Sequence, residues 1–439
     1  MRIFFWLITS LVITVTINAQ SSYPFQITLE PVIPEGFAGL QSYAWAKDGD
    51  KVLLAGGRTD GLHRRQPFAS FNKKYNNTEL IVLDLKQEKV WKKNISSLPV
   101  SFAEQLQSSN MEFFQQGNQL LIIGGYGYSE TKRDHITHPA VISIKVKELI
   151  NAIITSQDIS PFIVQLIDER MAVTGGRLNK LGNLLYLVGG QRFDGRYNPH
   201  GPDHGPGFSQ QYTNQIRKFT LTEKKGSLSI DNYTAISDSQ LLHRRDYNLL
   251  TQFDEKGKEM LTIYSGVFQY DKNVPFTTLI DITENGYNQV TEFNQQFSHY
   301  HTATLPVYSK TNKILYSIFL GGIAQRYTDS AGKVITDNDI PFVKSISVVE
   351  RKGNSIEEYI LPDPMPGYFG AAAEFIPADE NLFTPNGILD LDKAGKKPLM
   401  AGYIIGGIDS RAPNVFWSNE ADPSRASPVI WKVYIRKNH

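Results

Sequence analysis

The stretch Val52-Leu53-Leu54-Ala55-Gly56-Gly57 is the first of six apolar runs that end in a glycine pair or a near relative of one. The later runs end at Gly124-Gly125, Gly189-Gly190, Ser265-Gly266, Gly321-Gly322 and Gly406-Gly407. The second glycines are 56 to 85 residues apart. Strand-like units at such a period indicate a propeller or an array rather than independent domains. A propeller brings one face of every repeat to a common axis, so the repeat also decides which residues meet.

Six units of this kind predict an all-β protein, a six-bladed β-propeller with four strands in each blade. A chain of 439 residues is long enough for such a ring, and an aromatic content of 11% suits a strand-rich protein. The formal net charge of +1 gives no sign of bulk nucleic-acid binding. We therefore expect no nucleic-acid partner.

Residues 1–19 have the features of a secretory signal peptide. Arg2 supplies a positive charge, residues 3–17 are mostly apolar, and Ala19 is a small residue suited to the position before cleavage. The apolar stretch is shorter than the roughly 20 residues of a spanning helix, which favours cleavage over anchoring. The chain has no cysteine and no later segment that would span a bilayer, so we expect a secreted or periplasmic protein without disulfides.

The mature chain, residues 20–439, is expected to be a single propeller domain. Its last repeat ends after a third strand at 428–436, so the segment Phe25 to Val32 is predicted to supply the missing outer strand and close the ring. Three stretches are longer than the repeat pattern requires and look inserted. They predict a rigid loop within 191–213, a short helix between blades within 147–168, and a long hairpin connection at 378–398.

The order of apolar strand, Gly-Gly, variable loop and a later strand such as Leu80 to Leu85 followed by Trp91 resembles the kelch repeat. The resemblance covers nearly the whole mature chain. It implies the propeller fold and little about function, because this fold hosts enzymes and binding modules alike. Ser265 departs from the pattern in place of a first glycine, and the usual Tyr and Trp positions are only partly kept.

Two kelch enzyme families are distantly similar. The galactose-oxidase type implies a copper site with a Tyr–Cys crosslink, which a chain without cysteine cannot form. The secreted sialic-acid mutarotases are six-bladed propellers closer in size and export. Their catalytic carboxylate and arginine cannot be matched here residue by residue, so the resemblance transfers no site residue. We predict no cofactor and no metal.

Histidine and arginine residues gather in two classes of loop that open on the same face of a propeller: those after the glycine pairs and those between blades. Eight of the nine histidines lie there. We predict an electropositive pocket at the mouth of the axial channel, with arginine pairing an anion and aromatic rings contacting a sugar. Alternatively, these side chains pair only with their neighbours. The predicted ligand-binding residues are His63, Arg64, Arg192, Arg196, Arg244, His299, His301, Arg326 and Arg411.

The densest short cluster runs from His243 through Arg244, Arg245 and Asp246 to Tyr247. As a catalytic group, His243 would act as general acid or base, Arg245 would hold an anion and Tyr247 would donate a proton. The same cluster would serve equally well as an ion-pair network at the start of a strand. Two histidines that lie two positions apart, as at 299 and 301, are weak evidence for a metal site.

Three hypotheses stay open. The first is a secreted propeller that binds an anionic carbohydrate or related small ligand on its loop face. The second is a mutarotase-like or lyase-like sugar enzyme that uses His243, Arg245 or Arg244, and a tyrosine. The third is a scaffold for a protein partner without pocket chemistry. A deep pocket with buried arginine and histidine favours the first two, and a flat face favours the third.

Overall fold

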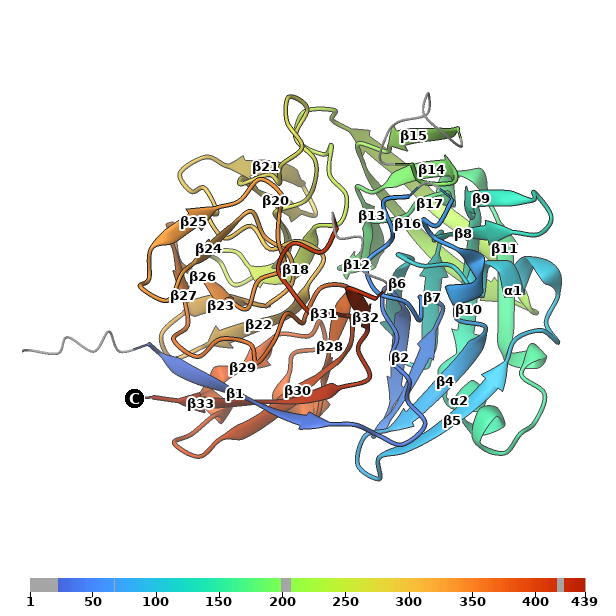
Figure 1. Cartoon of the computed structure of the whole chain (residues 1–439), viewed down its shortest axis with the longest axis horizontal. Helices are drawn as coiled ribbons and strands as arrows, with labels where there is room; N and C mark the ends of the chain where they lie inside the picture. Colours follow the sequence, from blue (N-terminus) through green and yellow to red (C-terminus); the bar gives the residue numbers. More distant parts are fainter. Residues whose placement is uncertain (1–22, 67, 199–206, 417–421, 439) are drawn as a thin grey trace, which may run out of the picture.

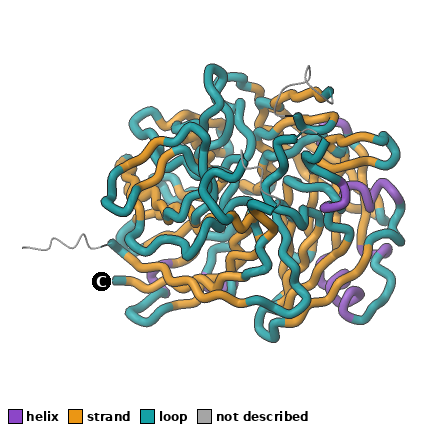
Figure 2. The backbone as a smooth tube through the Cα atoms, viewed as in Figure 1, coloured by secondary structure: helices purple, strands orange, loops and turns teal. Residues whose placement is uncertain are grey.

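The computed structural model describes residues 23–66, 68–198, 207–416 and 422–438. Six sheets follow one another around a common centre, so the chain is a six-bladed β-propeller, as the sequence predicts (Figure 1). Strands make up most of the regular structure, and helices are few and peripheral (Figure 2). Within the described ranges, every helix is too short or too polar to cross a bilayer. The expected signal peptide, residues 1–19, lies outside the described residues.

The first three blades each consist of four antiparallel strands taken in sequence order. The first contains β2 (Ala44–Asp48), β3 (Lys51–Ala55), β4 (Glu79–Asp84) and β5 (Lys89–Asn94). The second contains β6 (Glu112–Gln116), β7 (Gln119–Ile123), β10 (Ala140–Lys145) and β11 (Ile163–Ile167). The third contains β12 (Arg177–Leu181), β13 (Leu184–Val188), β16 (Gln215–Lys224) and β17 (Ser227–Ser237).

The last three blades repeat this plan with two variations. The fourth contains β18 (Asn248–Phe253), β19 (Glu259–Tyr264), β20 (Leu279–Thr283) and β21 (Gly286–Val290). The fifth contains β22 (Ala303–Ser309), β23 (Ile314–Leu320), β26 (Ile346–Lys352) and β27 (Ser355–Ile360), to which β29 (Leu389–Asp390) adds parallel to β22. The sixth contains β28 (Ala373–Pro377), β30 (Leu399–Gly406), β33 (Ile430–Lys437) and, as its outer strand, β1 (Phe25–Val32). β1 pairs antiparallel with β33 from Phe25 opposite Lys437 to Val32 opposite Ile430.

Four loops that join a second to a third strand contain a small hairpin of their own. These hairpins are β8 (Tyr126–Ser129) with β9 (Asp134–Thr137), β14 (Gln191–Gly195) with β15 (Phe208–Tyr212), β24 (Arg326–Thr328) with β25 (Val334–Thr336), and β31 (Ile408–Ser410) with β32 (Ser424–Ala426). The loop expected within 191–213 is thus partly the β14–β15 hairpin. Its Pro/Gly-rich part, 199–206, lies outside the described residues.

The helices correct one expectation. Helix α1 (Val100–Leu106) joins the first blade to the second, whereas α2 (Val146–Ile154) lies inside the second blade, between β10 and β11. Its apolar face packs into the core shared by the first two blades, and this holds it there. Short 3-10 helices occur at Lys73–Tyr75, Ser160–Phe162, Glu169–Met171, Glu380–Leu382 and Leu391–Lys393. The stretch 378–398 is no simple hairpin connection, because its β29 joins the fifth blade.

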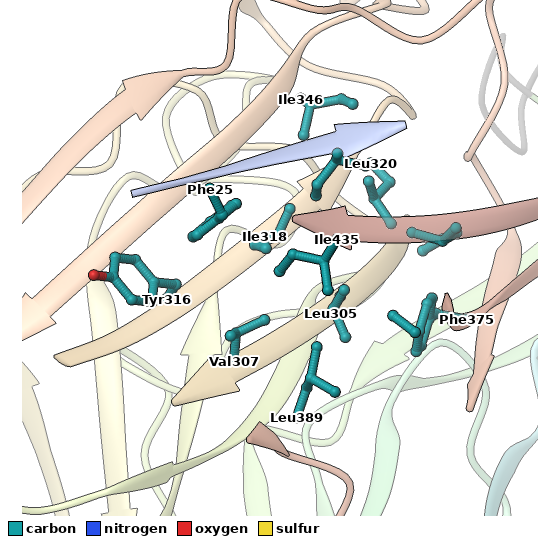
Figure 3. Close-up of a cluster of buried hydrophobic side chains, with 14 of the residues drawn as sticks. Phe25, Leu305, Val307, Tyr316, Ile318, Leu320, Ile346, Phe375, Leu389 and Ile435 are labelled. Atoms are coloured by element: carbon teal, nitrogen blue, oxygen red, sulfur yellow. The ribbon is translucent and has the colours of Figure 1, made fainter. Parts of the chain in front are cut away.

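Each junction between neighbouring blades has its own buried apolar cluster. The cluster between the fifth and sixth blades is the largest, and Phe25 of β1 and Ile435 of β33 lie in it beside Leu305 of β22 (Figure 3). The Phe25 ring meets Tyr316 edge-on, with centroids 5.2 Å apart. Burying apolar surface is the main favourable term in folding, so these six clusters hold the blades together.

The glycine pairs end the second strands, where the backbone passes close to the residues that lead into a blade. Gly57 has φ +85°, and a Cβ there would lie 2.5 Å from the Gln41 carbonyl oxygen. Only glycine fits such a position without strain. Ser265, the one departure in the six pairs, keeps a positive φ of 59° and its hydroxyl donates to the Ser298 carbonyl at 3.0 Å. The repeat therefore holds at this position despite the missing glycine.

Candidate functional site

One residue at the start of each blade has a left-handed backbone, and the six together form a ring around the axis, which we call the floor ring. Its members are Ser42, Asn110, Gly175, Asp246, His301 and Ala372. Backbone N–H groups donate to carbonyls across five of the six neighbouring pairs, with N···O distances of 2.7 to 3.1 Å. Among these described residues only the pair Asp246 and His301 lacks that bond. Gly, Asn, Asp and His tolerate a left-handed backbone better than most residues, and they occupy four of the six positions. The other two positions have small side chains, Ser42 and Ala372.

All six floor-ring residues line a cavity of about 740 Å³. The residue before each of them lies beside the residue after the second glycine of the same blade, as in the pairs Gln41–Arg58 and Tyr300–Ile323, and these also line the cavity. Each blade thus presents the same three positions to one space. The repeat fixes where these side chains lie and leaves their identity free to vary. Cavities of this size accommodate small molecules.

Charged and proton-transferring groups of the floor concentrate on the fourth and fifth blades. We call Arg245, Asp246, Tyr300 and His301 the polar sector. Arg245 Nη1 donates to Asp246 Oδ2, and His301 Nδ1 lies 3.8 Å from Asp246 Oδ1, so one carboxylate stands between a guanidinium and an imidazole. The three side chains are 17%, 14% and 18% exposed. Arg245 Nε donates to the Tyr212 hydroxyl at 3.1 Å, while its Nη2 has no protein partner among the described residues.

The polar sector combines a fixed cation with an uncharged base. Burial lowers the pKa of His301 to about 4; Arg177 lowers it as well, and Asp246 opposes them. The imidazole is therefore neutral at pH 7. A proton on Nδ1, beside the Asp246 carboxylate, leaves the Nε2 lone pair free. Burial opposes the charge of Arg245, but Tyr212 and Asp246 hold its pKa above the usual value, so the guanidinium stays ionised.

The tyrosine hydroxyls of the cavity fall into two groups. Three of them donate to backbone carbonyl oxygens, those of Tyr126, Tyr212 and Tyr270. The hydroxyls of Tyr197 and Tyr300 have no protein partner within the described chain. Burial raises the pKa of both, and Arg245 opposes that rise in both. Both hydroxyls are protonated at neutral pH and are available as proton donors.

A column of aromatic rings forms one wall of the cavity. His243 is stacked between Tyr212 and Tyr270, with ring centroids 3.7 and 4.0 Å apart. Its Nδ1–H donates to Asn214 Oδ1 at 3.1 Å, and burial followed by Arg245 lowers its pKa. Because the two phenol rings cover both faces of the imidazole, the column offers a flat surface for a sugar ring only at the outer face of Tyr212 or Tyr270.

His63 is a second aromatic element of the cavity wall. Its ring meets Tyr197 edge-on at 4.7 Å and stacks on Phe71 at 5.0 Å. Burial lowers its pKa to about 4, and the charges of Arg58 and Arg245 act in the same direction. His63 is therefore neutral at pH 7 and contributes ring surface rather than charge.

In contrast to the polar sector, the sixth blade has apolar residues at its floor positions, Ala371 and Ala372. Together with Phe342, Ile408 and Val415 these form a buried apolar cluster, which we call the apolar sector. All five residues line the cavity. The cavity thus has one charged side and one apolar side.

Below the floor ring, charged residues occupy the axial channel. Arg177, at the start of β12, pairs with Glu374 of β28 at 3.1 Å, an ion pair between blades on opposite sides of the ring. Glu112 Oε1 accepts from the Gly176 N–H at 2.7 Å, and burial raises the pKa of Glu112 to about 8. Its carboxyl group therefore holds a proton at pH 7. The positive charge of Arg177 under the floor helps to keep His301 neutral.

The predicted site residues separate into two groups. His63, His243, Arg245 and His301 line the cavity. The other predicted arginines lie outside its lining. Arg192 pairs with Glu169 and Asp194, Arg64 lies 3.8 Å from Asp422, Arg196 donates to the Phe68 carbonyl, Arg326 lies in β24, and Arg411 is exposed next to Pro423.

Arg244 and its neighbour Arg245 point in different directions. Arg244 is 1% exposed, and its guanidinium donates to the carbonyls of Leu241, Ser265 and Thr278 and to the Thr278 hydroxyl. It also lies over the Phe276 ring at 4.4 Å. A fully engaged guanidinium in the protein interior has a structural role, which differs from the ligand-binding role expected from the sequence.

Tyr247 and His299 are also built into the fold rather than the cavity. The Tyr247 hydroxyl donates to the Val188 carbonyl at 2.6 Å, just as the Tyr43 hydroxyl donates to the Ile405 carbonyl at 2.6 Å. Each of these tyrosines follows a floor-ring residue and ties its blade to the preceding one. His299 is buried, and its Nδ1 donates to the Gly321 carbonyl. Within the described residues, no three His, Asp or Glu side chains gather to hold a metal ion.

Sequence reasoning did not select four cavity residues: Asp246, Tyr197, Tyr212 and Tyr300. Asp246 and Tyr300 are immediate neighbours of predicted site residues, so the prediction missed them by one position along the chain. In the first three blades the floor-ring residue lies 15 positions before the second glycine, which is a readable signal. Longer hairpins and turns break that spacing in the fourth and fifth blades, where the charged residues lie.

Comparisons with known proteins add little to this picture. No family model and no curated protein matches the chain. Among solved structures 180 chains match, one of them the structure of YjhT. That match has a TM-score of 0.47 and 11% identity, and it covers 91% of this chain and 98% of the other. A likeness at this level says nothing about a ligand or an activity.

Proposed function

We propose that the cavity binds an anionic carbohydrate or a related small anionic ligand. The observation that carries the proposal is the free Nη2 of Arg245. Of the described lining residues only Arg58 and Arg245 are cationic, and the Arg58 guanidinium is already engaged by Asp60 and Asn76. Arg245 is therefore the group that offers N–H donors to a carboxylate, sulfate or phosphate.

The rest of the cavity fits a sugar ring. The Tyr212–His243–Tyr270 column offers a flat face, and the free hydroxyls of Tyr197 and Tyr300 offer hydrogen bonds. A concave space with a buried arginine and histidine supports a small-ligand site over a flat protein-binding face. A secreted or periplasmic location, supported by the signal-like residues 1–19 and the lack of cysteine, is part of the same proposal.

The test measures binding of the purified protein to a trigalacturonate and to the neutral trisaccharide of the same linkage by calorimetry. We expect binding of the acidic sugar alone, lost in Arg245→Gln and kept in Arg411→Gln. Arg411 is the matched control because it is an exposed arginine outside the cavity lining. Equal binding of both sugars, or binding retained in Arg245→Gln, would contradict the proposal.

An enzyme is the second candidate, and one observation favours it. His301 is an uncharged base whose Nε2 is free, and it shares the Asp246 carboxylate with the proposed anion-binding arginine. Such a base can take a proton from a bound ligand, besides accepting a hydrogen bond from one of its hydroxyl groups.

A further inference from the structure

We propose that the polar sector cleaves uronic-acid saccharides by β-elimination, with His301 as the base that removes the proton next to the carboxylate held by Arg245. The inference rests on the proposed function, because it assumes that an acidic sugar occupies the cavity. It adds a reaction, a substrate class and a base that differs from His243, the base expected from the sequence.

Removing a proton from the carbon next to a carboxylate needs three groups. A cation must neutralise the carboxylate, a base must be deprotonated at working pH, and an acid must protonate the departing oxygen. The cavity contains Arg245 with a free Nη2, His301 with a free Nε2, and the free hydroxyls of Tyr197 and Tyr300. The three kinds of group lie on adjoining blades around a single space.

Other common reactions on sugars fit the groups here less well. Glycoside hydrolysis uses two carboxyl groups, and the described lining contains two, Asp246 and Asp339. Asp246 is already paired with Arg245. A serine nucleophile needs a histidine partner, but the Ser42 hydroxyl donates to Gln41 and the Ser109 hydroxyl donates to the Tyr126 carbonyl. Proton removal from carbon is the reaction for which the described groups suffice.

The geometry places the base on the same carboxylate as the cation. Arg245 and His301 lie on either side of the Asp246 carboxylate, so a second carboxylate bound at Arg245 Nη2 is close to the imidazole. The carbon that bears this carboxylate in a hexuronate is C5. Asp246 also keeps the proton of His301 on Nδ1, which leaves the lone pair on Nε2, the ring nitrogen that does not face Asp246.

The step balances without a co-reactant. His301 Nε2 takes the proton from C5, and the C5–H electron pair becomes the C4=C5 double bond. The C4–O bond breaks with its electrons on oxygen, and that oxygen takes a proton from Tyr300 or Tyr197. One chain becomes two, one of which ends in an unsaturated uronate. The proton on His301 returns to the tyrosinate through solvent.

The experiment incubates the purified protein with polygalacturonate, alginate and a glucuronate-containing glycosaminoglycan. The ultraviolet absorbance of the new conjugated double bond reports cleavage, and calorimetry reports binding in parallel. We expect at least one substrate to be cleaved. His301→Gln should lower turnover on the order of 100-fold or more with binding kept within about threefold. Tyr300→Phe or Tyr197→Phe should lower turnover similarly, and Arg411→Gln should change neither quantity.

The outcomes separate the two proposals. Absence of binding for every acidic saccharide would overturn the proposed function and this inference with it. Binding without any rise in absorbance would overturn the elimination alone and leave a binding protein. Cleavage that survives in a folded His301→Gln protein would remove His301 as the base. Circular dichroism of each variant distinguishes these results from loss of folding.

Discussion

The polar and apolar sectors occupy equivalent positions of one repeat, yet they differ in nearly every chemical property. The fourth and fifth blades place Arg245, Asp246 and His301 at the cavity floor, whereas the sixth places Ala371 and Ala372. The backbone conformation is the same in both, with φ near +50° at Asp246, His301 and Ala372. Fold and chemistry are thus separable in this ring, because the backbone is repeated and the side chains are not.

The ring bonds differ between the sectors as well. Ala372 N–H donates to the His301 carbonyl at 2.8 Å, and Ser42 N–H donates to the Ala372 carbonyl at 3.0 Å. Between Asp246 and His301 the corresponding bond is missing, and the Asp246 carboxylate faces the imidazole instead. The polar sector gives up one backbone bond of the ring at the place where its side chains interact.

The largest effect should come from removing the cation of the polar sector. Arg245→Gln leaves no free cationic donor in the described lining, so the affinity for an acidic sugar should fall by about 100-fold, or roughly 3 kcal/mol. The neutral counterpart should stay without measurable binding. Titration calorimetry measures both sugars, and an unchanged affinity for the acidic sugar would show that the two sectors do not divide their roles as described.

The second effect concerns the carboxylate between Arg245 and His301. Asp246→Asn keeps a residue that accepts the left-handed backbone but leaves the largely buried Arg245 guanidinium without its charged partner. We expect unfolding to become easier by about 2 kcal/mol, somewhat below the cost of breaking a fully buried pair. An acidic sugar should then raise the melting temperature more than in the parent, since it replaces the missing charge. A smaller rise would contradict this pairing.

The third effect is a dependence on pH. Free His301 has a pKa of about 4, below the ordinary 6.5, so it is an available base at any pH above about 4. The ratio kcat/KM should stay level as pH falls to about 4 and then drop tenfold per unit. The folded state should also lose stability between pH 6.5 and 4, because the unfolded chain binds the proton first. An acidic limb near 6.5 would show that the base is not buried as described.

A fourth, smaller effect tests the floor ring without touching a charged residue. A Cβ on Gly175, which has φ +68°, would lie 2.8 Å from Asp246 Oδ1. Gly175→Ala should therefore destabilise the protein by about 1 kcal/mol and shift the carboxylate, with a severalfold loss of acidic-sugar affinity. Gly182→Ala is the control, because Gly182 also has a positive φ, of 56°. A Cβ there would meet only the end of the Glu284 side chain. It should cost similar stability and leave affinity unchanged.

The smallest effect belongs to the apolar sector. Ala372 has φ +54°, a conformation that glycine adopts without strain. Ala372→Gly should raise the free energy of unfolding by up to about 1 kcal/mol and leave acidic-sugar affinity within about twofold. Denaturant titration and calorimetry measure the two quantities. A marked change in affinity would show that the methyl group of Ala372 contacts the ligand.

The sequence predicted the propeller because its repeat is a backbone requirement. Positions such as Gly57 need a glycine whatever the ligand, and the apolar runs must fill the junctions between blades. The position of the outer strand also followed from counting strands in the last repeat. The helix within 147–168 was placed between blades because its packing against the first two blades depends on contacts that are distant in sequence.

The site was harder to predict because it depends on a register of one residue. Arg244 and Arg245 are indistinguishable in the sequence, but neighbouring residues of an extended segment point to opposite sides, so one guanidinium lies in the core and the other lines the cavity. Tyr247 could have been excluded as a site residue, because Tyr43 occupies the equivalent position in the first blade, which indicates a role in the repeat. Nothing local could have shown that Tyr212, which lies at the end of a hairpin, accepts a hydrogen bond from Arg245.

The pairing of β1 with β33 has a consequence for how the protein is made. Phe25 and Ile27 are synthesised long before residues 430–437, which form the strand that buries them. Until that strand is made, β1 is an unpaired edge with exposed apolar side chains, which invites association with other chains. A nascent chain of this protein therefore depends on being kept apart from its neighbours until residues 430–437 are made, because its sixth blade is incomplete without them.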